Sequence, residues 1–256
     1  MATTTSLLTT PGATIAEIVM ANPPVNALTV AGWFDLAEQV VAAGRNPDVG
    51  AVVLRADGKG WNAGVDIKEM QRTEGFDALL GANRGCYAAF AAVYECEVPV
   101  ICAVHDFCLG GGIGLVGNAD VVVAAEGTRF GLPEVNQGAL GAATHLSRLV
   151  PPHRMREMVY TALPIDASVL AGWGSISRVV PLEDLRDAAL EIATVICSKS
   201  RFVIRRAKES LNAIDPVDVK RSYRMEQGFT YELNLAGVAD EARDAFVGRT
   251  DADFSK

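Results

Sequence analysis

The chain has 256 residues, half of them apolar and 21% charged, with a formal net charge of −8. This size and composition exclude a disordered chain and suggest one globular domain, or one domain with a small appendage. The acidic balance argues against a nucleic-acid-binding protein, because such proteins bind phosphates mainly through Lys and Arg. A small anionic ligand held by a few local basic residues remains compatible with it.

The N-terminal segment and the apolar runs give no sign of export or membrane insertion. The first residues, MATTTSLLTTPG, lack the basic start and long apolar core of a signal peptide. The longest apolar candidate, residues 113–125, is interrupted by glycines, Asn118 and Asp120 and is too short for a membrane span. We therefore expect a cytoplasmic protein with no membrane partner. The cysteines have no C-x-x-C spacing, so we expect buried free thiols and no metal site.

Short apolar runs alternate with helical patterns over the first 180 residues. Runs rich in Val, Ile and Ala predict strands buried on both faces at residues 14–20, 50–55, 98–104, 119–124 and 175–180. Between them, apolar spacing from Trp33 predicts a helix that Gly44 closes, and residues 76–96 predict a longer one. This alternation predicts an α/β fold with mostly parallel strand pairing.

After residue 181 the strand signals stop, and helices are predicted at residues 182–199, 202–212, 217–235 and 239–247. We interpret the chain as effectively one domain, with a core over residues 1–180 and a helical C-terminal region over residues 181–256. The third of these helices carries many apolar residues, namely Tyr223, Met225, Phe229, Tyr231, Leu233 and Leu235. They predict that the helical region mediates self-association.

Two glycine-rich loops could present backbone N–H groups to a ligand. Residues 109–117 contain a G-x-G-x-x-G pattern, but the next predicted strand follows too soon for a dinucleotide-binding crossover helix. Adjacent glycines instead let a ligand oxygen approach the helix N-terminus, as in an oxyanion hole, with close helix–strand packing as the alternative. The loop at residues 59–70 follows a strand and could supply a second donor, or be a plain surface loop.

Two titratable residues stand in the region after residue 130. Glu134 follows Pro133 and could be an acid or base beside an apolar pocket, or could simply complement a helix dipole. His145 lies in a Gly/Ala-rich loop with room for a ligand, although a structural histidine is the alternative.

In order and spacing these segments resemble the crotonase family, the enoyl-CoA hydratase/isomerase superfamily. The resemblance covers essentially the whole chain and is carried by Pro24-Val-Asn-Ala-Leu28, Asn62-Ala-Gly-Val-Asp-Ile-Lys68, Leu109-Gly-Gly-Gly112 and Phe130-Gly-Leu-Pro-Glu134. It implies a spiral of ββα turns and a C-terminal helical region that builds trimers, often paired into hexamers. It also implies an acyl-CoA substrate, with coenzyme A entering as part of that substrate and no permanently bound cofactor.

The resemblance assigns roles to individual residues. It implies that the N–H groups of Val65 and Gly111 form an oxyanion hole for the thioester carbonyl and that Glu134 is the principal acid/base. The contacts to coenzyme A are expected from residues in the first loop and near the C-terminus, namely Ala63, Asp66, Lys68, Phe246 and Arg249.

Two departures from the family pattern alter the expected chemistry. The hydratases carry a Glu two residues after the glycine triplet, where this chain has Gly114. Hydration uses both carboxylates, so we expect a poor hydratase. His145 replaces a glycine near the family's substrate, and we expect it to assist Glu134 by orienting water or protonating a leaving carbon.

Residues 64–75, 140–148 and 223–229 look like a crotonase branch from bacterial steroid (cholesterol) degradation, which hydrolytically opens the last carbocycle, derived from ring D, of a CoA thioester. This likeness implies a CoA-thioester C–C hydrolase, in which water adds to a ring ketone and the oxyanion hole stabilises the enolate that results. Two alternatives stay open: an enoyl-CoA isomerase or weak hydratase that uses Glu134 alone, and a non-catalytic acyl-CoA-binding protein.

Overall fold

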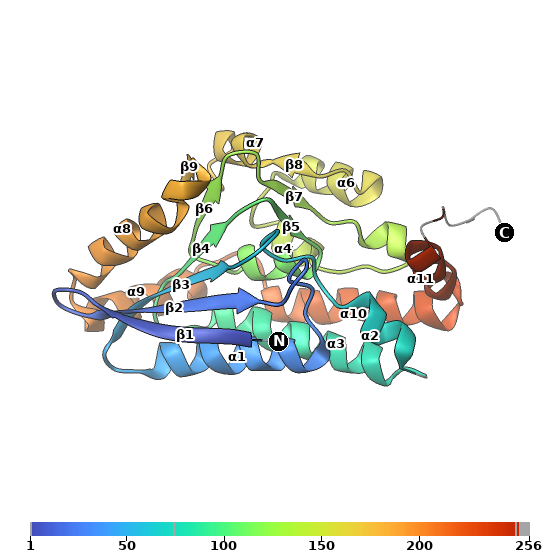
Figure 1. The fold of residues 1–256 in the computed structure, drawn as a ribbon, viewed down its shortest axis with the longest axis horizontal. Coiled ribbons are helices and arrows are strands. Elements are labelled where there is room, and N and C mark those ends of the chain that lie inside the picture. Colours follow the sequence, from blue (N-terminus) through green and yellow to red (C-terminus); the bar gives the residue numbers. More distant parts are fainter. Residues whose placement is uncertain (1, 74, 249, 251–256) are drawn as a thin grey trace.

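The computed structural model describes residues 2–73, 75–248 and 250, without the side chains of residues 2, 246 and 247. Its main sheet has six strands in the order β1-β2-β3-β4-β6-β9 (Figure 1). The first pair is antiparallel and every later pair is parallel. The strands are β1 (Ala2–Thr9), β2 (Thr14–Ala21), β3 (Val49–Ala56), β4 (Val100–Val104), β6 (Val121–Ala125) and β9 (Arg178–Val180).

The five predicted strands are confirmed, with β9 starting later than expected, and β1 is an additional strand. It is rich in Thr and Ser and mostly exposed at the sheet edge, so it lacks the apolar run of a buried strand. In the interior strands, alternate residues serve two cores. On β3, Val52 and Leu54 belong to the larger core, whereas Ala51 and Val53 belong to the smaller core under α8 (Leu185–Cys197).

A second, three-stranded sheet positions the site. It contains β5 (Phe107–Leu109), β7 (Arg129–Gly131) and β8 (Ile165–Asp166), in that order. β5 and β7 are parallel with Leu109 opposite Gly131, so the residues that follow both strands leave the sheet side by side. The Gly110 N–H donates to the Gly131 carbonyl at 3.1 Å. This pairing is what brings the glycine triplet next to Glu134.

Helices α1 (Val30–Arg45) and α3 (Asp77–Tyr94) pack against each other and cover one face of the main sheet, while α8 lies on the other side of it (Figure 1). The expectation that Gly44 closes the first helix is wrong. The helix runs on through Arg45, and Gly44 is buried where an added Cβ would lie 2.9 Å from Cys96 Sγ. Its role is close packing and not a helix end.

The remaining helices are short in the middle of the chain and longer toward its end. They are α2 (Ile67–Arg72), α4 (Gly111–Val116), α5 (Ala143–Leu146), α6 (Pro152–Thr161), α7 (Ala167–Gly172), α9 (Arg201–Ala213), α10 (Val219–Leu235) and α11 (Val238–Gly248), with 3₁₀ turns at Glu134–Gln137 and Leu182–Asp184. Within the described chain, helices alone follow β9, as predicted. α10 packs on α3 and α5, and α11 packs on α2 and the Glu134 turn, so the C-terminal helices reach the site.

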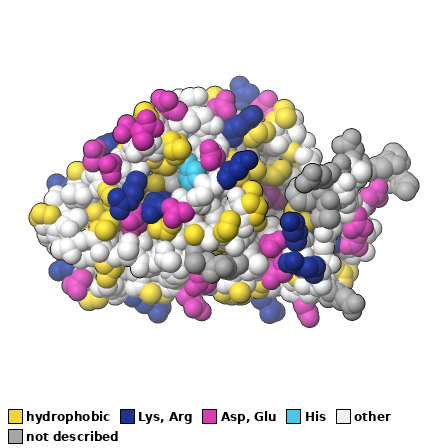
Figure 2. All heavy atoms as spheres, viewed as in Figure 1, with side chains coloured by type: hydrophobic (Ala, Val, Ile, Leu, Met, Phe, Trp, Pro, Cys, Tyr) yellow, Lys and Arg dark blue, Asp and Glu magenta, His cyan; other side chains and the backbone are white. Residues whose placement is uncertain are grey.

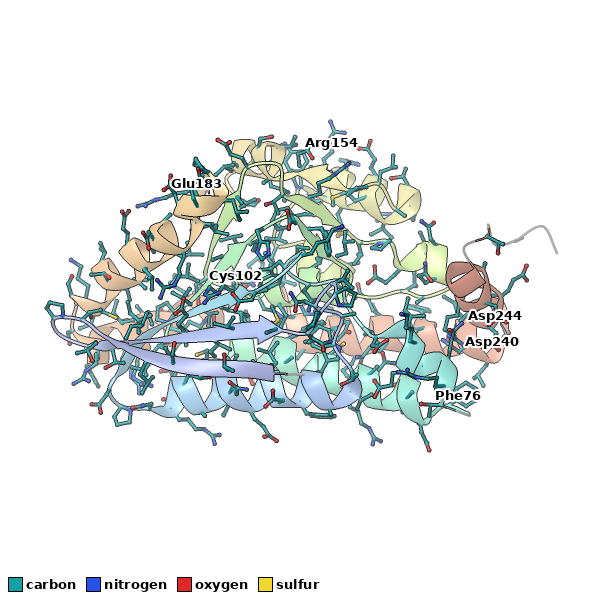
Figure 3. All side chains as sticks on the ribbon, in the orientation of Figure 1. Phe76, Cys102, Arg154, Glu183, Asp240 and Asp244 are labelled. Atoms are coloured by element: carbon teal, nitrogen blue, oxygen red, sulfur yellow. The ribbon has the colours of Figure 1, made fainter. Side chains whose placement is uncertain are left out.

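All five cysteines are free and buried, as predicted; Figure 3 shows Cys102 within the main sheet. Basic and acidic side chains are mixed over the face shown in Figure 2. No helix in the described part of the chain is long and apolar enough to cross a membrane.

Candidate active site

The loop after β3 is braced by the segment that contains Asn26 and Leu28. The Asn26 side chain donates to the Asp57 and Gly60 carbonyls at 2.9 and 2.8 Å. Leu28 bonds on both sides of Val65: its N–H donates to Gly64 O at 2.8 Å, and its carbonyl accepts from Asp66 N at 2.9 Å. In extended backbone successive groups point in opposite directions, so the Val65 N–H faces away from Leu28.

The glycine triplet meets this loop directly. Gly110 has φ +57°, and Gly111 starts α4 with its N–H outside the helical ladder. An added Cβ on Gly64 would lie 3.1 Å from Gly111 N, and one on Gly111 would lie 2.8 Å from the Trp33 ring. The glycines therefore permit close packing, and Val65 and Gly111 line one cavity, while the oxyanion hole stays a prediction.

Glu134 faces the same glycines from the other side. An added Cβ on Gly110 would lie 2.8 Å from Glu134 Oε1, and Glu134 Oε2 is buried with no hydrogen-bond partner among the described residues. Burial, with a smaller contribution from the nearby charge of Glu226, raises the pKa of Glu134 to about 8. A carboxyl group with this pKa exchanges protons near neutral pH, which suits an acid/base role.

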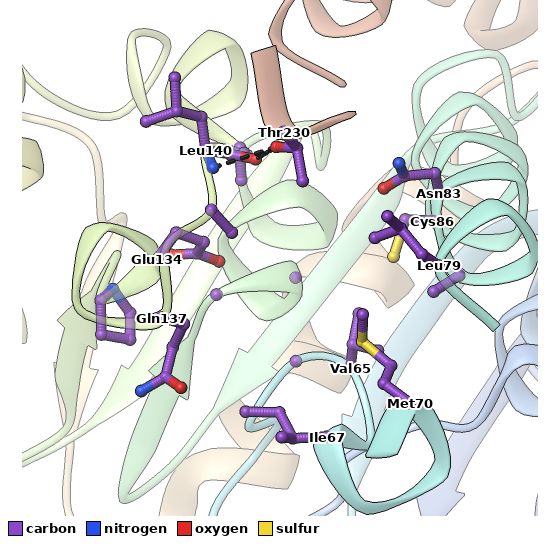
Figure 4. Close-up of a pocket in the computed structure, with 18 of the residues that line it drawn as sticks. Val65, Ile67, Met70, Leu79, Asn83, Cys86, Glu134, Gln137, Leu140 and Thr230 are labelled. Atoms are coloured by element: carbon purple, nitrogen blue, oxygen red, sulfur yellow. Dashed lines mark hydrogen bonds between the residues drawn. The ribbon is translucent and has the colours of Figure 1, made fainter. Parts of the chain in front are cut away.

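These groups line a mainly apolar cavity of about 160 Å³ (Figure 4). Its walls include the predicted residues Ala63, Val65, Gly111 and Glu134. They also include residues that the sequence analysis missed, from α3 (Leu79, Ala82, Asn83, Cys86), from the Glu134 turn (Gln137) and from the C-terminal helices (Tyr223, Thr230, Asn234, Arg243).

The α3 wall carries a signal that was available in the sequence. Leu79, Ala82 and Cys86 recur at helical spacing, and Asn83 is the polar residue on that face. A polar side chain on an otherwise apolar face needs a partner, and a bound ligand is one way to supply it.

His145 does not line the cavity, in contrast to the expectation that it sits beside the substrate. Its ring packs against Phe90 at 4.9 Å and Tyr223 at 4.8 Å between centroids. Asn118 donates from Nδ2 to the Phe90 carbonyl, which leaves Asn118 Oδ1 to accept from His145 Nδ1 at 3.2 Å. Burial lowers the pKa of His145 to about 3, not the near-neutral value expected. This geometry favours the structural alternative, although the catalytic role stays an untested prediction.

Phe90, which packs on His145, also occupies the space beside Gly114, where the hydratases carry their first carboxylate. An added Cβ on Gly114 would lie 2.2 Å from the Phe90 ring, which also makes an edge contact with Trp33. Gly114 therefore lacks both a carboxylate and the space for one.

Of the residues predicted to contact coenzyme A, only some lie at the cavity or at the exposed surface next to it. Ala63 is at the cavity, and Asp66 caps α2 by accepting from the N–H groups of Lys68 and Glu69 at 2.9 and 3.3 Å. Lys68 is exposed on α2. Phe246 belongs to α11 but its side chain lies outside the described part, as does Arg249 entirely. Among the described residues, no cluster of three or more His, Cys, Asp or Glu side chains could hold a metal ion.

Comparison with known proteins gives a consistent result. The enoyl-CoA hydratase/isomerase family model matches residues 10–256. The chain is 63% identical over 242 residues to the (7aS)-7a-methyl-1,5-dioxo-2,3,5,6,7,7a-hexahydro-1H-indene-carboxyl-CoA hydrolase of Mycobacterium tuberculosis, covering 94% of this chain and 98% of that protein. It is 31% identical over 223 residues to the carnitinyl-CoA dehydratase of Salmonella enteritidis, covering 86% and 85%.

Solved structures share the fold. An enoyl-CoA hydratase from Mycobacterium avium subsp. paratuberculosis superposes with a TM-score of 0.83 at 20% identity, covering 98% of each chain. A carnitinyl-CoA hydratase from Mycobacterium avium superposes with a TM-score of 0.82 at 26% identity, covering 99% of each chain. The ββα spiral predicted from the resemblance is thereby confirmed.

Proposed function

The chain belongs to the enoyl-CoA hydratase/isomerase family, and from that premise we propose that it hydrolyses a ring C–C bond in a steroid-derived bicyclic diketone carried as a CoA thioester. The Mycobacterium tuberculosis relative is named for a dioxo-hexahydroindene-carboxyl-CoA, a fused bicycle with two ring ketones. At 63% identity over 94% of the chain, a related substrate is the simplest inference.

One geometric observation carries the proposal: the Glu134 carboxyl lies against Gly110, directly beside the Val65 and Gly111 N–H groups, in an apolar cavity. A base and an oxyanion site so close together can act on two carbonyls of one acyl group. The thioester oxygen would accept from the two N–H groups, and the ring ketone would lie near Glu134.

The proposed reaction has three steps. Ionised Glu134 takes a proton from water as the water oxygen bonds to the ring ketone carbon. The resulting tetrahedral oxyanion collapses to a carboxylic acid and breaks the adjacent ring C–C bond. The electron pair of that bond passes into the thioester as an enolate, which the two N–H groups stabilise, and the proton held by Glu134 finally neutralises the carbanion.

This reaction needs one acid/base carboxylate, and position 114 offers no second one. Because Phe90 fills the space beside Gly114, ordinary hydration of a short enoyl-CoA should be slow.

The test compares the dioxo-hexahydroindene thioester with crotonyl-CoA in H₂¹⁸O, followed by mass spectrometry. We expect the bicyclic thioester to gain one water, with ¹⁸O in a new carboxylate and the CoA ester intact. Release of free CoA, or a hydration rate on crotonyl-CoA typical of a two-Glu hydratase, would overturn the proposal.

Coenzyme A itself is proposed to bind along the loop at Ala63 and the adjoining α2, where exposed Lys68 is available to a phosphate. Asp66 would act by holding the start of α2, since its carboxylate is engaged with backbone N–H groups. Phe246 and Arg249 remain proposed contacts on family resemblance alone.

We further propose that the chain forms a homotrimer, or a dimer of trimers, through its C-terminal helices. The buried face of α10 is largely polar (Tyr223, Gln227, Thr230, Asn234), whereas its apolar residues Met225, Phe229 and Leu235 are 63%, 45% and 74% exposed. Phe202 and Ile214, at each end of α9, are both 73% exposed. An apolar outer face of this kind is typical of an association surface.

Sedimentation velocity at micromolar concentration tests this association. We expect a trimer or hexamer for the wild type and dissociation for Met225→Glu combined with Leu235→Glu. A wild-type monomer would refute the proposal.

A further inference from the structure

The cavity wall formed by α3 carries a hydrogen-bond donor without a partner. Asn83 Nδ2 is buried and has no hydrogen bond within the described part of the chain. Figure 4 shows Asn83 across the cavity from Glu134, with Cys86 and Leu79 of the same helix beside it. A buried amide donor left unpaired is unfavourable, and an acceptor on a ligand in this cavity would satisfy it.

Three polar side chains that the C-terminal helices contribute to the cavity wall make hydrogen bonds within the protein. Thr230 donates to the Leu140 carbonyl, Asn234 Nδ2 donates to Thr230 O at 2.8 Å, and Arg243 Nη1 donates to Asn234 Oδ1 at 2.7 Å. By contrast, Asn83 Nδ2 has no partner among the described residues.

The backbone at Asn83 is fixed independently of its side chain. Its carbonyl accepts from Gln227 Nε2 of α10 at 2.7 Å. Replacing the side chain therefore leaves this link between α3 and α10 in place, so a substitution of Asn83 removes the amide without breaking it.

Attack on a ketone needs groups on two sides: a base on the side from which water arrives, and a donor at the oxygen, where negative charge develops. Glu134 and Asn83 lie on opposite walls, and the Val65 and Gly111 N–H groups are assigned to the thioester. Building on the proposed function, we propose that the Asn83 side-chain amide donates a hydrogen bond to the attacked ring ketone oxygen and stabilises the oxyanion formed there.

The first test is steady-state kinetics on the dioxo-hexahydroindene thioester. Asn83→Leu, of similar size but without a donor, and Asn83→Asp should each lower kcat about ten- to hundredfold, with a smaller change in KM. Arg84→Gln, at the next and exposed position of α3, is the control and should match wild type. Unchanged kcat in both Asn83 variants would overturn the proposal.

The second test does not depend on turnover. Calorimetry in a Glu134→Gln background compares the dioxo thioester with an analogue in which the attacked ketone is a methylene group. With Asn83 the dioxo compound should bind about tenfold or more tightly, and in Glu134→Gln combined with Asn83→Leu this preference should vanish. An equal loss of affinity for both compounds would refute the hydrogen bond and leave only a packing role. If the wild type opens no ring, the proposed function fails, while this comparison still decides whether Asn83 binds the ketone.

Discussion

Glu134 and His145 are titratable side chains that each hold one buried polar atom with no hydrogen-bond partner among the described residues, yet their surroundings differ. Glu134 faces an apolar cavity that Val65 and Gly111 also line, whereas His145 is enclosed by Phe90, Tyr223 and Asn118. Burial drives each toward its neutral form, raising the pKa of Glu134 to about 8 and lowering that of His145 to about 3. The comparison teaches that a perturbed pKa marks a reactive group where a substrate has room to reach it.

The largest expected effect is on turnover at Glu134. Glu134→Gln keeps the shape of the side chain and removes the proton-exchanging carboxyl, so kcat should fall roughly 10²- to 10⁴-fold with little change in KM. Steady-state kinetics on the bicyclic thioester measures this. Turnover near the wild-type rate would remove Glu134 from the mechanism.

A smaller loss of turnover is expected when Glu134 is kept but its carboxyl group is pushed out of position. In Gly110→Ala the new Cβ would lie 2.8 Å from Glu134 Oε1, and φ at this position is +57°. We expect kcat to fall about ten- to hundredfold. Gly127→Ala is the matched control, since Gly127 also has a positive φ, +74°, but an added Cβ there meets nothing within 4 Å. Equal losses in both variants would mean that backbone strain alone is responsible.

For His145 we expect stability to change more than rate. His145→Ala removes ring contacts with Phe90 and Tyr223 and should lower the free energy of unfolding by about 2–4 kcal/mol. The kcat per folded molecule should stay within a few-fold of wild type. Melting temperature and single-turnover rate on one preparation decide the matter. A hundredfold slower reaction at unchanged melting temperature would restore the catalytic role first expected from the sequence.

The two side chains should have opposite effects on the pH dependence of stability. The raised pKa of Glu134 contributes stability that is complete below its unfolded value of 4.5 and is lost as pH rises through about 8. The lowered pKa of His145 contributes stability that is complete above 6.5 and is lost as pH falls through about 3. Between pH 4.5 and 6.5 the two groups change the free energy of unfolding with pH by equal and opposite amounts, so their contributions cancel.

When either group is removed, the free energy of unfolding should change with pH as the remaining group dictates, by about 1.4 kcal/mol per pH unit. Relative to wild type, Glu134→Gln should gain stability as pH rises within that window, and His145→Ala should lose it. Urea unfolding at several pH values measures both differences, and parallel curves for all three proteins would contradict the assigned shifts.

The smallest effect concerns Glu226, whose charge helps to raise the pKa of Glu134. Glu226 Oε1 accepts from Thr144 N at 2.8 Å, a bond that an amide oxygen preserves. If ionised Glu134 is the base, wild-type kcat/KM should rise with pH to a midpoint near 8, and Glu226→Gln should move this midpoint lower. A midpoint that stays in place would show that the two carboxyl groups do not interact.

Much of the site could be predicted because it depends on local sequence. Continuous Val and Ile runs need burial on both faces and therefore form interior strands. The glycine triplet and the residues up to Glu134 each follow a short strand, so the segments that carry the N–H donors and the carboxyl could be recognised before their contact was known. The polar strand β1 was not predicted, because it lies at the exposed edge of the sheet and has no run of buried apolar residues.

The sequence by itself thus determined the layers of the fold and the segments that meet at the cavity, namely the two glycine-rich loops and the turn at Glu134, since each depends on neighbouring residues. Only the tertiary structure decided the direction of side chains whose neighbours come from distant segments. It placed the His145 ring among the aromatic rings of the core. It also filled the space beside Gly114 with Phe90 from α3, and set Asn83 opposite Glu134. On α10 it turned the polar face inward to the cavity and left Met225 and Leu235 exposed, because packing against α3 and α5, and not the hydrophobicity of the helix, fixes its rotation.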